Sequence, residues 1–177
     1  LDDRAFAARV QAGPRGSGER PALTIRDYAD DLAEAFYAIN AEWIAAMFAL
    51  EENDRRILSD PRGEILDRGG LILFVEAEGL GVVGTCALMT TSPGCFELTK
   101  MAVSERARGL KAGEHLLRAV LARAGTMDIE TLYLLTNTAC AAAIHLYEKV
   151  GFRHDAEIMD RFGRRYARCN VAMRYEP

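Results

Sequence analysis

Residues 103–114 carry the clearest chemical pattern in the sequence, a strand end followed by a polar turn and a helix start. The first backbone N–H groups of a helix have no partner inside it, and the helix dipole adds about half a positive charge there. Gly109 and Gly113 would let the backbone approach a phosphate closely, and Arg108 and Lys111 supply full positive charges. The turn therefore predicts a site for an anion such as phosphate, with an ordinary glycine-containing helix start as the alternative.

The spacing of this turn differs from that of two common phosphate-binding loops. A P-loop needs G-x-x-x-x-G-K-[ST] and a dinucleotide-binding fold needs G-x-G-x-x-G, and residues 103–114 contain neither. A serine hydrolase is equally unsupported, because the sequence lacks the G-x-S-x-G turn that exposes a catalytic serine.

Glu97 and Tyr147 are the side chains whose types best suit proton transfer. Alternation along the strand places Glu97 on the same face as Thr99, Met101 and Val103, so Glu97 could accept a proton inside a cleft. The alternative is an ordinary solvated strand glutamate. Tyr147 lies on the apolar face of the last long helix, where the alternative is a core tyrosine with one satisfied hydroxyl.

Hydrophobic periodicity places these residues on a regular series of elements. Helical spacing predicts helices from Asp30 or Asp31, along Trp43, Ile44, Met47 and Leu50, from Pro61 to Arg68, over 112–124, and from Asn137 to Gly151. Apolar runs predict strands at 23–25, 71–77, 82–89, 95–103, 132–136, 156–159 and 167–173, the last two as a hairpin. This order predicts an α/β fold of the α+β type, with a mixed, mostly antiparallel central sheet of about seven strands flanked by about four helices.

The chain divides into an arm and one domain. Residues 1–22 combine a short predicted helix, Asp3 to Val10, with a glycine-rich linker, and residues 23–177 carry the regular pattern of a single domain.

Composition narrows the class of protein. The net charge is −4 and the charges are interspersed, so the basic footprint of a nucleic-acid binder is missing. The four cysteines occur singly and no histidine has metal-ligand spacing, which indicates a reduced, cytoplasmic protein without a metal. No stretch reaches the roughly 18 apolar residues of a membrane span, so no membrane association is expected.

Four stretches of the sequence together resemble the GNAT N-acetyltransferase superfamily. They read ELTKMAV at 97–103, RGLKAG at 108–113, TN at 136–137 and AIHLYEKVGF at 143–152. The resemblance spans roughly residues 23–173 and implies the fold of that superfamily. The family usually has glycine at the position of Lys111, so a left-handed backbone is less favourable there in this chain.

The resemblance implies acetyl-CoA as co-substrate and no metal. The strand at Met101, Ala102 and Val103 would splay from the strand at 132–136 and pair with the pantetheine arm. The pyrophosphate would lie on the turn formed by Arg108, Gly109, Leu110, Lys111, Ala112, Gly113 and Glu114. Asn137 would reach the pantetheine or acyl end, or would instead cap the following helix.

The resemblance also assigns chemical roles. Glu97 would take the proton of an amine directly or through water, and Tyr147 would protonate the departing thiolate. A backbone N–H near Met101 would stabilise the oxyanion. The expected activity is an acetyl-CoA-dependent N-acetyltransferase acting on a primary amine of a small molecule or peptide, by direct transfer in a ternary complex. The alternative is a non-catalytic acyl-CoA-binding sensor module.

Two regions favour different acceptors. In the superfamily the first helices usually form a wall of the acceptor site. Here they carry Tyr37, Asn40 and Trp43 together with acids, Glu42, Glu51, Glu52 and Asp54, which suit an amine or another cation. The alternative is that these acids form an ordinary solvated surface. The C-terminal segment carries arginines, Arg161, Arg164, Arg165 and Arg168, which suit a carboxylate or phosphate on the acceptor. Hairpin edges and the N-terminal arm are candidate homodimer surfaces.

Overall fold

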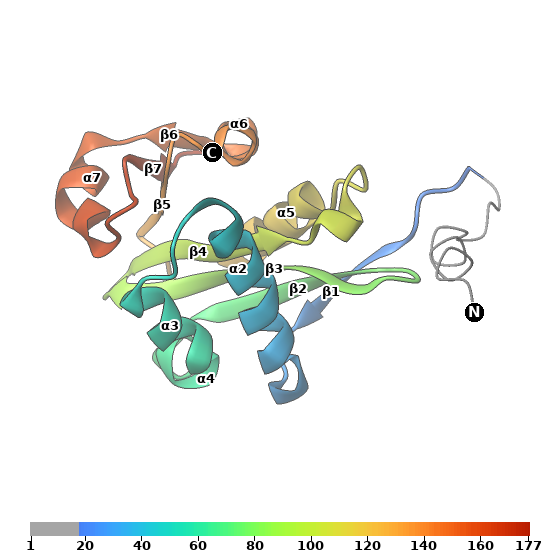
Figure 1. The fold of residues 1–177 in the computed structure, drawn as a ribbon. Coiled ribbons are helices and arrows are strands. Elements are labelled where there is room, and N and C mark those ends of the chain that lie inside the picture. Colours follow the sequence, from blue (N-terminus) through green and yellow to red (C-terminus); the bar gives the residue numbers. More distant parts are fainter. Residues whose placement is uncertain (1–17) are drawn as a thin grey trace.

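The computed structural model describes residues 18–177, and the helix expected at Asp3 to Val10 lies outside the described residues. The elements follow along the chain as β1 (Leu23–Asp27), η1 (Asp30–Leu32), α2 (Ala33–Met47), α3 (Glu52–Ser59), α4 (Pro61–Glu64), η2 (Leu66–Arg68), β2 (Leu71–Ala77), β3 (Gly81–Ser92), β4 (Cys95–Val103), η3 (Glu105–Ala107), α5 (Ala112–Ala124), β5 (Thr131–Thr136), α6 (Ala141–Val150), β6 (Phe152–His154), α7 (Ala156–Phe162), η4 (Gly163–Arg165) and β7 (Val171–Tyr175). Figure 1 shows their arrangement.

The seven strands form one mixed sheet in the order β1-β2-β3-β4-β5-β7-β6. Neighbours are antiparallel throughout, except β4 and β5, which run parallel. A parallel pair needs a long crossover, and here the connection contains α5. The predicted mixed, mostly antiparallel sheet is confirmed, while residues 18–177 contain six α-helices rather than about four.

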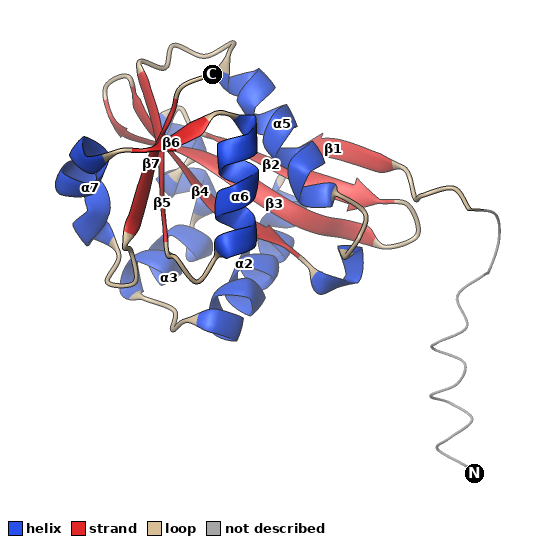
Figure 2. Cartoon of the chain, turned by 90° about the horizontal axis from the view of Figure 1, so that it is seen from above, coloured by secondary structure: helices blue, strands red, loops and turns tan. Residues whose placement is uncertain are grey.

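Helices cover both faces of the sheet. Leu116, Leu117 and Val120 of α5 pack on one face together with Tyr147 of α6. Helices α2 and α3 cover the opposite face of the first strands, where α2 contributes Phe36 to a second core. Figure 2 shows α5 on one side of these strands and α2 and α3 on the other.

Residues 33–47 form one continuous helix, whereas the sequence predicted a second helix reaching Leu50. No glycine or proline interrupts this segment, so nothing breaks the helix before its end. The chain leaves the helix at Phe48, which is extended (φ −141°, ψ −179°), and Leu50 therefore lies outside α2. The next helix, α3, begins after Glu51, whose N–H donates to the Asp54 carboxylate at 2.9 Å.

The predicted strand at 156–159 is wrong, because these residues begin helix α7. The Asp155 carboxylate accepts the Ile158 N–H at 2.9 Å, which is the bond of a helix N-cap. Ile158 is buried, and Phe162 one turn later stacks on Tyr133 with ring centroids 4.2 Å apart. Strand β7 pairs with β5 on one side, and on the other with β6, which directly follows α6.

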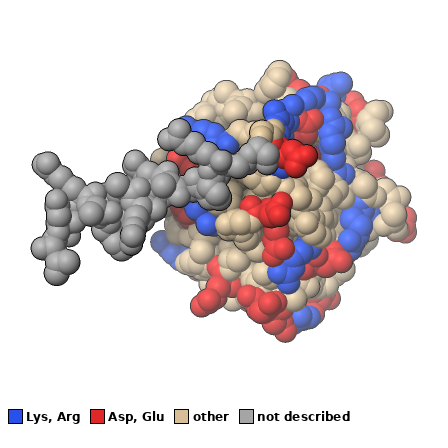
Figure 3. All heavy atoms as spheres, turned by 90° about the vertical axis from the view of Figure 1, so that its right-hand side faces the viewer, with Lys and Arg blue, Asp and Glu red and all other residues tan. Residues whose placement is uncertain are grey.

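Charged side chains of both signs are interspersed over the face shown in Figure 3. All four cysteines are free thiols. Within residues 18–177, no helix has the length and apolar character needed to cross a membrane.

Candidate functional site

Strands β4 and β5 are paired at one end only. Their parallel register joins Cys95–Leu98 to Thr131–Leu134, and within the described sheet it goes no further. Backbone groups of β4 beyond Leu98 therefore have no strand partner on the β5 side. Figure 1 shows β5 turning away from β4.

A β-bulge lies where the two strands part. Lys100 and Met101 of β4 stand opposite the single residue Cys86 of β3. Lys100 has φ +51°, in the left-handed region that a non-glycine residue seldom adopts. Because an extra residue bends and twists its strand, the bulge accounts for the departure of β4 from β5 after Leu98.

The bulge overturns the predicted strand face. Alternation placed Glu97 with Met101 and Val103, but the extra residue shifts the alternation by one position. Met101 and Val103 pack against the core on the α5 side, whereas Glu97 lies opposite Met89, which belongs to the core on the α2 side. The prediction was wrong because it assumed a regular strand.

A cleft that opens to solvent occupies the region where the strands part. It is lined by Asn40, Trp43, Ile44, Phe48, Glu97, Leu98, Thr99, Lys100, Met101, Leu134, Leu135, Thr136, Asn137, Cys140, Tyr147, Tyr166, Arg168 and Cys169. The cleft thus brings together predicted residues from α2, β4, β5 and α6. The turn at 108–114 lies outside this lining.

Glu97 is 1% exposed and forms an ion pair. Arg165 Nη1 donates to Glu97 Oε2 at 2.8 Å, and to the Tyr133 hydroxyl at 3.3 Å. Burial raises the pKa of Glu97, and this outweighs the opposing effect of the positive charges of Arg165, Lys100 and Arg168. A carboxylate with a raised pKa is a stronger base than a solvated one.

Tyr147 is buried on α6 and faces the cleft from the opposite side of the sheet. Its hydroxyl lies 3.8 Å from Met101 Sδ, beside the bulge. Burial raises the pKa of Tyr147, so the phenol keeps its proton over the neutral range. The side chain is therefore a proton donor rather than an acceptor.

A buried ionic network lies beside Glu97 and was missed by the sequence reasoning. Asp54, expected on an acidic surface, is fully buried and accepts from Lys100 Nζ at 2.8 Å. Arg168 holds the same carboxylate with two bonds of 2.7 and 2.8 Å. Lys100 Nζ also donates to the Tyr166 hydroxyl at 3.1 Å. The one signal in the sequence was a lysine within a strand of mostly apolar residues.

The turn at 108–114 has a left-handed backbone at Lys111, a conformation that is less favourable for lysine than for glycine. Gly109 (φ +81°) and Lys111 (φ +57°) are both left-handed, although such a backbone costs a lysine about 1–2 kcal/mol. Within residues 18–177, the N–H groups of Gly109 and of positions 111–114 have no hydrogen-bond acceptor. Their dipoles and the α5 helix start form a positive concavity.

Charged side chains around this turn differ in how they are engaged. Arg108 and Lys111 are exposed, and Arg108 contacts only Glu105, at 3.4 Å. Glu114 is held by Lys149 at 2.8 Å and Arg118 at 2.9 Å, which together lower its pKa to about 2.

The Asn137 side chain ties two loops together. Its Nδ2 donates to the Arg168 carbonyl at 2.7 Å, and its Oδ1 accepts the Ala139 N–H at 2.8 Å. The N-cap of α6 is Cys140, so the alternative of Asn137 as helix cap is wrong.

Two of the three predicted acceptor residues line the cleft. Asn40 is buried and donates to the Phe36 carbonyl at 2.9 Å, and Trp43 is half-buried beside Phe48. Tyr37 is 38% exposed and does not belong to the lining.

The sequence model described as "Acetyltransferase (GNAT) family" matches residues 25–152, well over half of the chain. The chain belongs to the GNAT acetyltransferase family. Membership supports acyltransferase chemistry in general. This family generally uses acetyl-CoA, so membership also supports acetyl-CoA as the co-substrate.

Known GNAT proteins resemble the chain over most of its length. The Bacillus subtilis (strain 168) protein named "Uncharacterized N-acetyltransferase YvbK" is 28% identical over 117 residues, covering 64% of this chain and 74% of that protein. A GNAT acetyltransferase from Staphylococcus aureus Mu50 superposes with a TM-score of 0.77 at 22% identity, covering 87% and 98% of the two chains. The ribosomal-protein-alanine N-acetyltransferase of Brucella melitensis gives 0.65 at 21% identity, covering 87% and 99%. At such identities the solved structures establish the shared fold.

Proposed function

We propose that this GNAT protein is an acetyl-CoA-dependent N-acetyltransferase that acetylates a primary amine of a small molecule or peptide. The observation that carries the proposal is the gap between β4 and β5, with Glu97 and Tyr147 both lining the cleft that fills it. A buried carboxylate with a raised pKa and a phenol that keeps its proton are a matched base and acid.

The cofactor would extend along the gap. The pantetheine amides would pair with the free backbone edge of β4 at Met101, Ala102 and Val103. The pyrophosphate would accept from the free N–H groups at 109–114, with Arg108 and Lys111 beside it. Asn137 lines the cleft where the acyl end would lie.

Direct transfer in a ternary complex follows from this placement. Glu97 takes the proton of the ammonium group, directly or through water, and the free amine attacks the thioester carbonyl. A backbone N–H near Met101 stabilises the oxyanion. As the intermediate collapses the C–S bond would break, and Tyr147 would give its proton to the thiolate. The attacking nitrogen would lose its second proton to water, and water would return a proton to Tyr147, leaving CoA and the neutral amide.

Thiol release from acetyl-CoA across a panel of amines tests the proposal. Release that depends on the amine, with acetylated product detected by mass spectrometry, is the expected result. Tight CoA binding without amine-dependent release from any member of the panel would instead favour a non-catalytic acyl-CoA-binding module.

A further inference from the structure

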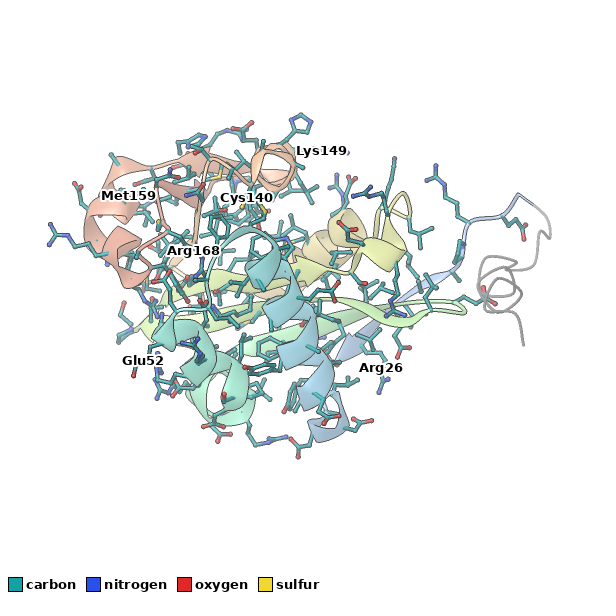
Figure 4. The ribbon with its side chains drawn as sticks, viewed as in Figure 1. Arg26, Glu52, Cys140, Lys149, Met159 and Arg168 are labelled. Atoms are coloured by element: carbon teal, nitrogen blue, oxygen red, sulfur yellow. The ribbon has the colours of Figure 1, made fainter. Side chains whose placement is uncertain are left out.

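The acids expected to form a cation-binding wall do not face the cleft. Asp54 is fully buried against Lys100 and Arg168, and Glu51 accepts from Arg168 Nη1 at 3.0 Å and from the Ala167 N–H at 2.8 Å. The charged side chains that line the cleft are one acid, Glu97, and two cations, Lys100 and Arg168. Figure 4 shows Arg168 toward the middle of the molecule, above α3, and Glu52 at the outer edge.

Arg168 makes its side-chain contacts with the protein through its two terminal nitrogens, Nη1 and Nη2. Nη1 and Nη2 hold the two oxygens of Asp54 as an end-on fork, and the second hydrogen of Nη1 goes to Glu51. Nε–H and the second Nη2–H lie on the other edge, and no residue of the described chain accepts from them. The side chain is 18% exposed and lines the cleft.

The position of this free edge is fixed by packing. The guanidinium carbon lies 4.7 Å from the Tyr166 ring centroid and 5.9 Å from that of Phe48. Asp54 orients the group from behind, because its carboxylate is fully buried. A guanidinium held this way presents two parallel donors in the geometry that matches a carboxylate.

Charge selects a carboxylate rather than a phosphate. Asp54 and Glu51 carry as much negative charge as Lys100 and Arg168 carry positive charge, so the cluster has little net charge before a ligand binds. A monoanion on the free donors of Arg168 therefore adds less repulsion from Glu97 and Asp54 than a phosphate dianion would.

Resting on the proposed function, we propose that the acceptor amine also carries a carboxylate, as an amino acid does, and that the free edge of Arg168 binds it. The amine then faces Glu97, and the aromatic wall of Trp43 and Phe48 borders the acceptor's side chain.

A ligand comparison on the unaltered protein tests this inference. We would measure kcat/KM at saturating acetyl-CoA for matched sets of acceptors. Each set contains an amino acid, its carboxamide, the corresponding decarboxylated amine and the aminophosphonate analogue. The acids are expected to exceed the amides and decarboxylated amines by about 10- to 100-fold, the range for losing charge-assisted hydrogen bonds. Equal or better turnover of the compounds without carboxylate, or a preference for the phosphonates, overturns the inference while the proposed function stands. No turnover of any compound refutes the proposed function itself.

A variant locates the recognition at Arg168. Arg168→Lys keeps a charge opposite Asp54 but removes the side-on pair of donors. The expected result is a KM for the amino acid raised about 10- to 100-fold and a reduced preference for acid over amide, with KM for acetyl-CoA little changed. Arg174→Lys is the matched control, because Arg174 also pairs with two acids, Asp155 and Glu157, away from the cleft. An unchanged preference in Arg168→Lys contradicts the assignment, and if that variant does not fold, the ligand comparison decides alone.

Discussion

Burial raises the pKa of both Glu97 and Tyr147, with different chemical consequences. For the tyrosine, a raised pKa keeps the hydroxyl protonated, which suits a group that must donate a proton. For the glutamate, it makes the ionised form a stronger base, while the ion pair with Arg165 opposes full protonation. One physical effect thus prepares an acid and a base at neutral pH.

Replacement of Tyr147 by phenylalanine tests the acid. The one hydrogen-bond partner of the hydroxyl among the described residues is Met101 Sδ, so Tyr147→Phe should fold normally. We expect kcat to fall by roughly 100-fold or more, the usual contribution of a general acid, with KM for acetyl-CoA little changed. Tyr175→Phe, whose ring packs on Phe152 outside the cleft, is the control. A kcat within twofold of the parent would remove Tyr147 from the mechanism.

Asp54 connects α3, β4 and the segment between η4 and β7. Burial alone would raise the pKa of Asp54, but the hydrogen bonds and charges of Arg168 and Lys100 hold this pKa far below its usual value. The same contacts hold Lys100 at the bulge, where its left-handed backbone would otherwise relax. The shape of the cleft thus depends on an ionic cluster contributed by distant segments.

The variant Asp54→Asn is expected to lower the free energy of unfolding by about 3–5 kcal/mol at pH 7, because it leaves two buried cations without their carboxylate. A lowered folded-state pKa stabilises the fold above the unfolded-state value near 3.9, and this contribution is lost as pH falls toward the folded-state pKa. The difference in free energy of unfolding between the parent protein and Asp54→Asn should therefore be smaller at pH 3 than at pH 7, by roughly 1 kcal/mol.

Urea unfolding at pH 7 and pH 3 measures this difference in the free energy of unfolding. Glu52→Gln on the exposed side of the same helix is the control and should change stability little. A difference in the free energy of unfolding that does not depend on pH would show that Asp54 does not titrate as its contacts imply.

The sheet consists of strands β1–β4 on one side and β5–β7 on the other, joined by one short paired segment that we call the seam. Strands β4 and β5 are paired only over Cys95–Leu98 and Thr131–Leu134. A ligand lying in the gap beyond this seam would contact β4, the turn before α5, and α6 at once. It would bind the folded chain but not the unfolded one, so it would raise stability by mass action.

CoA at about 100 times its dissociation constant should therefore add about 2.7 kcal/mol to the free energy of unfolding. For a chain of this size the melting temperature should rise by about 5–10 °C, measured by scanning calorimetry. Adenosine, which lacks both pyrophosphate and pantetheine, should give little shift at the same concentration. The absence of a shift with millimolar CoA would argue against the gap as the cofactor site.

Features that depend on neighbouring residues could be predicted from the amino-acid sequence. Short stretches of sequence predicted the strands, the helix start after Gly109, and the position of Tyr147 relative to Gly151. The order of these elements predicted the mixed sheet. The predicted strand at 156–159 failed because a single N-cap, Asp155, outweighed a short apolar run.

Which charged side chains line the cleft depends on contacts between segments far apart in the sequence. Asp54 and Arg168 are 114 residues apart, so no local pattern reveals that they pair. The bulge at Lys100 depends on β3 pairing and on that distant carboxylate, and it changes which side of the sheet Met101 faces. A buried charge must be paired because removing it from water is costly, and the attraction between paired charges is stronger in the interior. Which charges are buried together is a property of the complete fold.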